Sequence, residues 1–180
     1  MRRPEGANVS RRGLEATVAL VVLLIGGWLV VSWWVSPQRQ VNRNIKRIQK
    51  LVSKTPGESD LVALGKARKI SEMFAENFEF RAEGFDFHTR DRQRLAAGVH
   101  QYRSFSRAIA MRVQDKELTV DKEHRRASTY LTADFVTQAR DITGREAYRF
   151  RIDWVEQADD WRIDYVELLE ILEEPTRPWF

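Results

Sequence analysis

The chain has 180 residues, of which 30 are Lys or Arg, 26 are Asp or Glu and none is Cys. This length accommodates one modest domain plus an appendage, and the absence of cysteine excludes disulfides, thiolate metal sites and a cysteine nucleophile. Residues 1–57 hold ten basic and two acidic residues, whereas residues 58–180 hold 20 basic and 24 acidic ones. Because phosphate backbones bind clusters of Lys and Arg, the acidic body argues against a nucleic-acid partner.

The sequence divides into five segments that differ in charge and hydropathy. We expect a basic tail (1–15), a transmembrane helix (16–35), a basic amphipathic connector (36–58), a folded domain (59–172) and a short C-terminal tail (173–180).

Residues 16–35 form a run of twenty uncharged residues. As a helix, such a run is about 30 Å long, which is the thickness of a bilayer's hydrocarbon core. We assign Trp28, Trp33 and Trp34 to this anchor, and the last two suit an interfacial aromatic belt. The run is longer than the apolar core of a signal peptide and lacks the small residues of a cleavage site after it. We therefore expect an uncleaved anchor.

The orientation of the anchor follows from its flanks. Basic residues stand on both sides, so the positive-inside rule is nearly balanced. A short basic tail ahead of an apolar run is typical of a signal anchor and favours a cytoplasmic N-terminus. We therefore expect a single-pass protein of the inner (cytoplasmic) membrane with its body on the extracytoplasmic, periplasmic side. Expected partners are membrane lipids and either a membrane or envelope protein or a second copy.

The connector resumes a helical pattern after Pro37. Its apolar residues have the spacing of a coiled-coil seam and comprise Val41, Ile45, Ile48 and Val52. The other faces carry the candidate contacts for anionic lipid, which are Arg39, Arg43, Lys46, Arg47 and Lys50. Three interpretations stay open: the stripe pairs with a second copy, the helix lies on anionic headgroups, or it is a solvated spacer.

The body begins with helical periodicity from Asp60 to about Asn77 and then changes to a period of two. A second helix opens at Asp91. Alternating apolar residues then predict strands over 109–120, 127–135, 148–154 and 161–172, with a phase shift near Asp115. Short links between these strands indicate an antiparallel meander whose apolar face the helices cover. The fold class is α+β.

Two stretches resemble a known family. The last strand, Asp160-Trp161-Arg162-Ile163-Asp164-Tyr165-Val166-Glu167, and the helix that starts Asp91-Arg92-Gln93-Arg94 resemble those of the nuclear transport factor 2-like superfamily, which includes SnoaL-like and ketosteroid isomerase-like domains. The resemblance covers about residues 60–172 and implies a cone-shaped α+β fold with a curved sheet. The layout of anchor plus domain is also similar to that of periplasmic assembly factors.

Enzymes of this superfamily hold a base and a Tyr or Asp donor inside the cone, and the apolar faces of this sequence supply no such pair. Asp134 and Asp153 lie out of phase with the core residues and face away. His100 falls on the exposed side of its helix, and His88 and His124 fall in turns. We therefore expect no catalytic residue, no metal site and no cofactor.

Two functions remain in view. The first is a membrane-anchored, non-enzymatic interaction or assembly module that docks a partner through its sheet or cone mouth. The alternative is a small-molecule binding or lyase/isomerase-like domain that holds an apolar or lipidic ligand in the cone. The candidate lining residues of the cone are Phe78, Phe80, Tyr102, Thr129, Tyr148, Phe150, Trp154 and Trp161.

Overall fold

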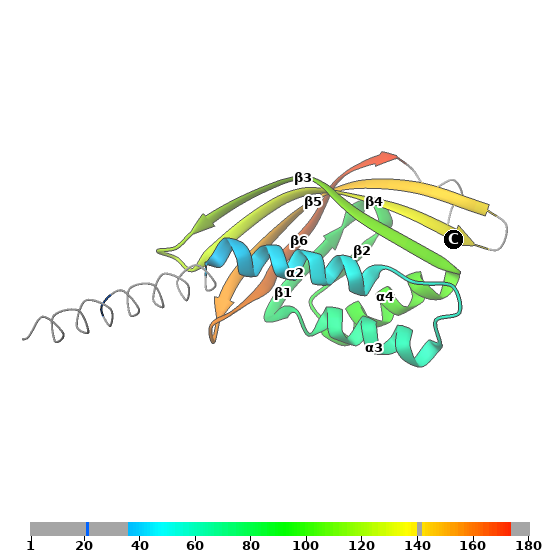
Figure 1. Ribbon diagram of the computed structural model, residues 1–180, viewed down its shortest axis with the longest axis horizontal. Coiled ribbons are helices and arrows are strands. Elements are labelled where there is room, and N and C mark those ends of the chain that lie inside the picture. Colours follow the sequence, from blue (N-terminus) through cyan, green and yellow to red (C-terminus); the bar gives the residue numbers. More distant parts are fainter. Residues whose placement is uncertain (1–20, 22–35, 140–141, 174–180) are drawn as a thin grey trace, which may run out of the picture.

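The computed structural model describes residues 21, 36–139 and 142–173 (Figure 1). Its helices are α2 (Pro37–Val52), α3 (Asp60–Ser71), the 3₁₀ turn η1 (Glu83–Phe85) and α4 (Arg92–Phe105). Its strands are β1 (Phe74–Ala82), β2 (Phe87–Thr89), β3 (Ala108–Asp121), β4 (Arg126–Ala139), β5 (Ile142–Gln157) and β6 (Asp160–Glu173).

The six strands form one sheet in the order β2-β1-β6-β5-β4-β3. The predicted antiparallel meander is confirmed for β3 to β6, which pair in sequence. The sheet as a whole is mixed, however, because β1, which the predicted meander does not include, pairs with β6 in parallel. That pairing joins segments more than 80 residues apart, so no short connection in the sequence predicts it.

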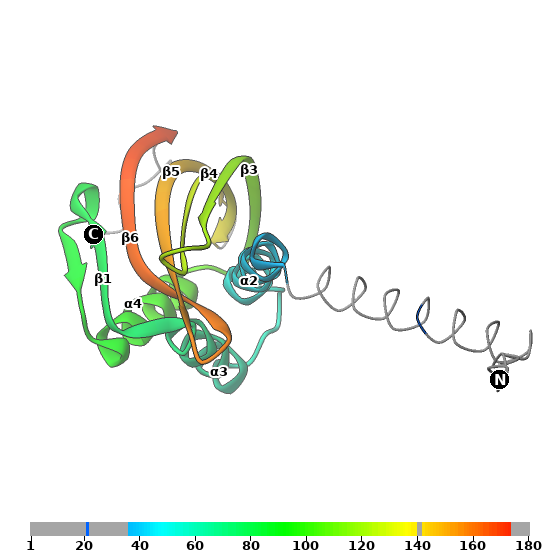
Figure 2. The same ribbon diagram turned by 90° about the vertical axis from the view of Figure 1, so that its left-hand side faces the viewer.

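The sheet is strongly curved, and its concave face holds the helices. Figure 1 shows α2 running across the sheet, with α3 and α4 beneath it, and Figure 2 shows α2 end-on at the open side of the curved sheet, next to β3. The helices also contact one another, since α3 packs on α4 and α2 packs on α3 as well as on β3 and β6. The predicted α+β cone is therefore present.

Alternation along the strands selects the concave face. In β4, Ala127, Thr129, Leu131 and Ala133 are buried, and the residues between them are more exposed. The largest buried side chains of the core are Trp154 and Trp161. The predicted phase shift in β3 is confirmed, because Asp115 has a φ of 44° and the register with β4 slips between Gln114 and Glu117.

The first helix of the predicted body is shorter than expected. It ends at Ser71, and Phe74 already begins β1. The apolar residues Met73 and Phe74 continue the helical spacing, but Met73 packs in the core from the turn after α3 and Phe74 from the first position of β1. A short apolar run does not by periodicity alone distinguish a helix end from a strand start.

The connector helix α2 belongs to the core of the domain. Val41 is fully buried and Ile45 nearly so, and both join the same apolar cluster as Trp154. Ile48 and Val52 pack against that cluster. The interpretations of this stripe as a self-pairing seam, or as part of a solvated spacer, are therefore wrong: the sheet is the surface that covers it.

The predicted anchor lies outside the described residues, apart from Val21, and so do Trp28, Trp33 and Trp34. Among the helices in the part of the chain that the structure describes, none is long and apolar enough to cross a bilayer.

Candidate functional site

A buried carboxylate lies between the sheet and α4. Glu146, near the start of β5, is 2% exposed. Its Oε2 accepts a hydrogen bond from the Tyr148 hydroxyl at 2.9 Å and a long one from the Tyr102 hydroxyl at 3.5 Å. Its Oε1 accepts a bond from the Thr137 hydroxyl at 3.4 Å. Among the described residues no Lys, Arg or His pairs with this carboxylate, so all of its partners are neutral hydroxyls.

Aromatic rings surround this cluster, which we call the Glu146 cluster (Glu146, Tyr102, Tyr148 and Thr137). Tyr148 makes edge contacts with Phe85 and Phe135, at centroid distances of 5.6 and 5.7 Å, and lies 6.2 Å from Phe150. Tyr102 contacts Phe135 at 6.3 Å. Phe85, Phe135 and Phe150 are each only partly buried, so solvent reaches part of the aromatic wall around a carboxylate that is itself shielded.

Burial raises the pKa of Tyr102 and of Tyr148 above the usual range of a phenol, and the neighbouring Glu146 carboxylate adds to the rise. Both hydroxyls therefore stay protonated at neutral pH and act as hydrogen-bond donors. The cluster combines a carboxylate, which can accept a proton, with phenols, which can donate hydrogen bonds to a ligand oxygen. The structure thus places a carboxylate inside the cone, where the sequence indicated none, and the expectation of no catalytic residue stays a prediction.

Sequence reasoning missed Glu146, although a signal for it exists. Glu146 lies two residues before Tyr148, so it shares the inward phase of β5 with Phe150 and Ile152. Thr137 likewise continues the inward phase of Phe135 in β4. Extending each alternating run by one step toward the β4–β5 turn identifies both residues.

The predicted lining residues occupy two regions. Tyr102, Tyr148 and Phe150 gather around Glu146. Phe78, Thr129, Trp154 and Trp161 are fully buried, and Phe80 is partly buried against Phe87. Trp154 donates its indole N–H to the Thr129 hydroxyl at 3.0 Å, which indicates a structural role for that pair. Their role in lining a ligand site stays a prediction.

The other titratable candidates lie elsewhere. Asp134 accepts a bond from Gln114, and Asp153 pairs with Arg151, both in the outward phase that the sequence predicts. His88 and His124 are exposed and pair with Glu79 and Asp121 respectively.

The prediction that His100 lies on the exposed side of α4 is wrong, because its ring is half-buried and its Nδ1 is buried without a partner in the described structure. Within residues 36–139 and 142–173, no three His, Asp or Glu side chains gather as a metal site requires.

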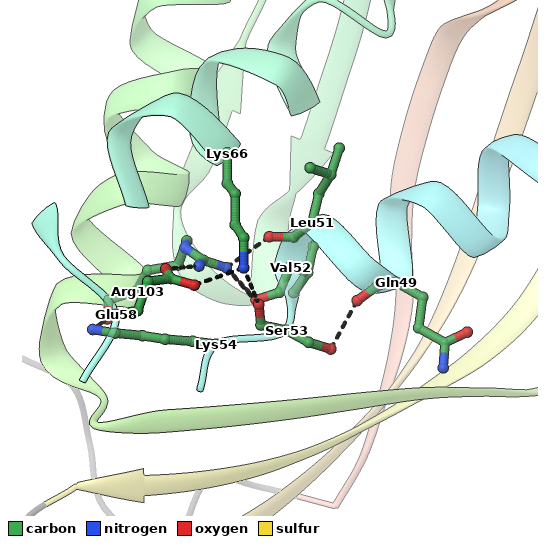
Figure 3. A network of polar contacts seen from close by, with 8 residues as sticks. All are labelled: Gln49, Leu51, Val52, Ser53, Lys54, Glu58, Lys66 and Arg103. Carbon is green, nitrogen blue, oxygen red and sulfur yellow. Dashed lines mark hydrogen bonds and ion pairs between the residues drawn. The ribbon is translucent and has the colours of Figure 1, made fainter. Parts of the chain in front are cut away.

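A second buried polar cluster closes the end of α2 (Figure 3). The Arg103 side chain is fully buried, and its Nη1 donates to the carbonyl oxygens of Leu51 at 2.7 Å, Val52, and Ser53 at 3.2 Å. Its Nη2 pairs with the Glu58 carboxylate, which Lys66 also contacts at 2.6 Å. These carbonyls are groups that a helix end leaves unsatisfied. The Arg103 Nε is buried without a partner in the described structure, but both terminal nitrogens are bonded within the cluster. We therefore assign this Arg103 network (Arg103, Glu58 and Lys66) a structural role.

The basic candidates for lipid contact lie on the outer side of α2. Arg43, Lys46, Arg47 and Lys50 are exposed, and Arg39 is partly buried. Their contact with lipid stays a prediction.

Comparison with known proteins agrees with this architecture. The family model of the SnoaL-like domain matches residues 46–167. A comparison with curated protein sequences finds no significant match. The matched range includes the end of α2, in accordance with the packing of that helix in the core.

Solved structures share the fold at low sequence identity. A proposed scytalone dehydratase from Novosphingobium aromaticivorans has a TM-score of 0.60 at 11% identity, covering 78% of this chain and 89% of that one. An NTF2-like protein with a cystatin-like fold from the same species has a TM-score of 0.58 at 17% identity, covering 92% and 93%. A proposed calcium/calmodulin-dependent protein kinase II association domain from Xanthomonas campestris scores 0.60 at 9% identity, covering 74% and 86%.

At such identities the structural likeness shows the fold alone, and it covers proteins with unlike functions. The family match spans more than half of the sequence and contains α3, α4 and most of the sheet. The chain therefore belongs to the family of SnoaL-like domains.

Proposed function

We propose that the domain binds an apolar small molecule that carries a hydroxyl or carbonyl oxygen, with that oxygen against the Glu146 cluster. The observation that carries this proposal is a carboxylate 2% exposed with only neutral hydroxyl partners in the described structure. Removing a carboxyl group from water with so few partners opposes folding. A group that the fold retains against its own stability is typical of a functional site.

The geometry of the cluster supports proton-transfer chemistry. Glu146 would accept a proton from the ligand and return it to a second atom of the same molecule, so isomerisation needs no other reactant. Tyr102, whose bond to Glu146 is the longest of the three, is the donor that a ligand oxygen would most easily engage. The proposal is compatible with a family of ligand-binding and isomerase- or dehydratase-like proteins, and it is the second of the two functions that the sequence left open.

We retain the membrane location as part of the proposal. Residues 16–35 would anchor the chain in the inner membrane with the domain on the extracytoplasmic side, where a membrane or envelope protein or a second copy would be within reach. A topology reporter fused after Phe180 tests this directly. Activity of a reporter that folds only outside the cytoplasm supports it, and activity of a cytoplasm-only reporter contradicts it.

The ligand site is tested with 2-naphthol, a fluorescent phenol that becomes strongly acidic when excited. The full chain is held in phosphatidylcholine nanodiscs, with empty nanodiscs as the blank. If the naphthol hydroxyl lies against Glu146, excitation transfers its proton to the protein and naphtholate emission exceeds that of the blank, in which water is the only acceptor.

We expect Glu146→Gln to remove that emission and the matched change Glu170→Gln, at an exposed carboxylate, to preserve it. Equal emission from both variants, or none from the wild type, contradicts the proposal.

A further inference from the structure

We infer that the outer face of α2 docks on an anionic bilayer surface. This basic face consists of Arg39, Arg43, Lys46, Arg47 and Lys50. The inference concerns a different surface from the Glu146 cluster and does not depend on the proposed ligand, but it rests on the proposed membrane location of residues 16–35.

The orientation of the basic face is fixed by what lies on the other side of α2. Val41 and Ile45 are buried against the sheet, which leaves the opposite side of the helix pointing outward. Two flanking amides prevent the helix from rolling: Asn44 donates to the Trp161 carbonyl at 2.9 Å and Gln49 to the Met111 carbonyl at 3.0 Å. At a rotation of 100° per residue, the five basic positions span an arc of about 100°, centred opposite the buried stripe.

Four cations of this face, Arg43, Lys46, Arg47 and Lys50, are exposed and lie near no carboxylate of their own helix. Residues 37–52 include five basic residues and no acidic one. Arg43, Lys46, Arg47 and Lys50 make no ion pair with any described residue, whereas arginines elsewhere on the domain pair with carboxylates, as Arg90 does with Glu79 and Arg151 with Asp153.

A sixth cation lies beside the face. Lys116 of β3 reaches α2, where its Nζ contacts Asn42 at 2.5 Å. A one-signed surface of this kind attracts an extended anionic partner.

An anionic bilayer suits the position of the face in the chain. Helix α2 begins one residue after the twenty uncharged residues 16–35, whose length matches a hydrocarbon core. Each Lys or Arg near an anionic surface contributes about 1 kcal/mol, and the attraction acts within about 10 Å. Nucleic acid is disfavoured, because residues 58–180 carry a net charge of −4, from 20 basic and 24 acidic residues.

The absence of cysteine allows a single reporter cysteine to be placed at will. We would attach a fluorophore to Arg43→Cys on the basic face, or to Arg149→Cys on the exposed side of β5, in the full chain. The chain is reconstituted in vesicles of phosphatidylcholine alone, or of equal parts phosphatidylcholine and phosphatidylglycerol, each with a nitroxide on a fraction of the headgroups. Quenching then reports contact with the headgroups.

We expect strong quenching at position 43 in the anionic vesicles only, reversed by high salt, and weak quenching at position 149. Replacing Lys46, Arg47 and Lys50 by Gln lowers the equilibrium constant for docking about a hundredfold, at about 1 kcal/mol for each charge. We therefore expect this triple change to abolish the quenching. The matched control replaces Lys69, Arg107 and Arg112 by Gln. These three side chains are exposed and make no ion pair with any described residue, and their replacement leaves the quenching unchanged.

Three results overturn the inference: equal quenching at positions 43 and 149, quenching in the anionic vesicles that the triple change leaves intact, or no quenching at position 43. Duplex DNA is added at an equimolar amount as a competitor. If it abolishes the quenching at position 43 in anionic vesicles, the basic face binds nucleic acid instead.

Discussion

The Arg103 network makes a quantitative prediction about stability. The Glu58 side chain is 4% exposed and is the counter-charge of a guanidinium that is fully buried. Glu58→Gln keeps the shape of the side chain but leaves that guanidinium without an anion. Removing one partner of a buried ion pair costs about 3–5 kcal/mol. Because Arg103 retains three carbonyl acceptors at the end of α2, we expect the lower end of this range, about 3 kcal/mol.

The same network predicts how the loss depends on pH. Burial alone would raise the pKa of Glu58, but hydrogen bonds and ion pairs with Lys66 and Arg103 outweigh it and hold that pKa below its usual value. A carboxyl group whose pKa is lowered on folding stabilises the fold when the pH is above its pKa in the unfolded chain, about 4.3. This contribution disappears as the pH falls through the pKa of the group in the folded protein. The difference in the free energy of unfolding between wild type and Glu58→Gln is therefore largest at neutral pH and decreases in acid.

Urea unfolding followed by circular dichroism at several pH values measures both effects. The matched control is Glu72→Gln, which removes the pair with Arg68 on the surface of α3, where the two side chains are 56% and 79% exposed. Exposed pairs of this kind contribute about 0.5 kcal/mol or less. A loss at Glu58 no larger than at Glu72, or one that persists unchanged in acid, refutes the reasoning.

Three further predictions follow from other contacts. Ile45→Ala should lower the free energy of unfolding by about 2–5 kcal/mol, because α2 packs in the core; a change below 1 kcal/mol in urea unfolding would place α2 outside it. Tyr148→Phe should cost about 1.5–3 kcal/mol, since it removes the shortest bond to Glu146, whereas the exposed control Tyr130→Phe should cost little; equal effects would contradict this. Hydrogen bonds from Arg90 and Arg81 hold the pKa of Glu79 at about 2, so Arg90→Gln should raise that pKa. An NMR titration measures it, and an unchanged pKa would refute the ion pair between Arg90 and Glu79.

Much of the fold follows from local pattern. Period-two alternation predicts β3 to β6, because one face of each strand packs on the helices and the other faces solvent. The parallel pairing of β1 with β6 has no such local signature, since it depends on which distant edge remains open after the meander has formed. The α2 stripe illustrates the same limit: its spacing predicts a helix with one apolar side, but any apolar surface can cover that side.

Part of the candidate site could be predicted from the sequence. Tyr102 and Tyr148 are among the predicted lining residues because both share a phase with apolar neighbours, and the structure brings both hydroxyls to Glu146. Glu146 was missed because a charged residue beside a turn resembles the solvated end of a strand. Arg103 offered no signal at all, since its burial depends on the carbonyl groups at the end of a different helix.

The central claim is that a ligand oxygen meets Glu146 inside the cone. It is tested most directly by intermolecular NOEs between bound 2-naphthol and the full chain carrying ¹³C-labelled aromatic and leucine side chains. We predict contacts from the naphthol ring to the rings of Tyr148 and Phe135. Contacts confined to the exposed Leu61 and Leu64 of α3, with none to Tyr148, would contradict an interior site.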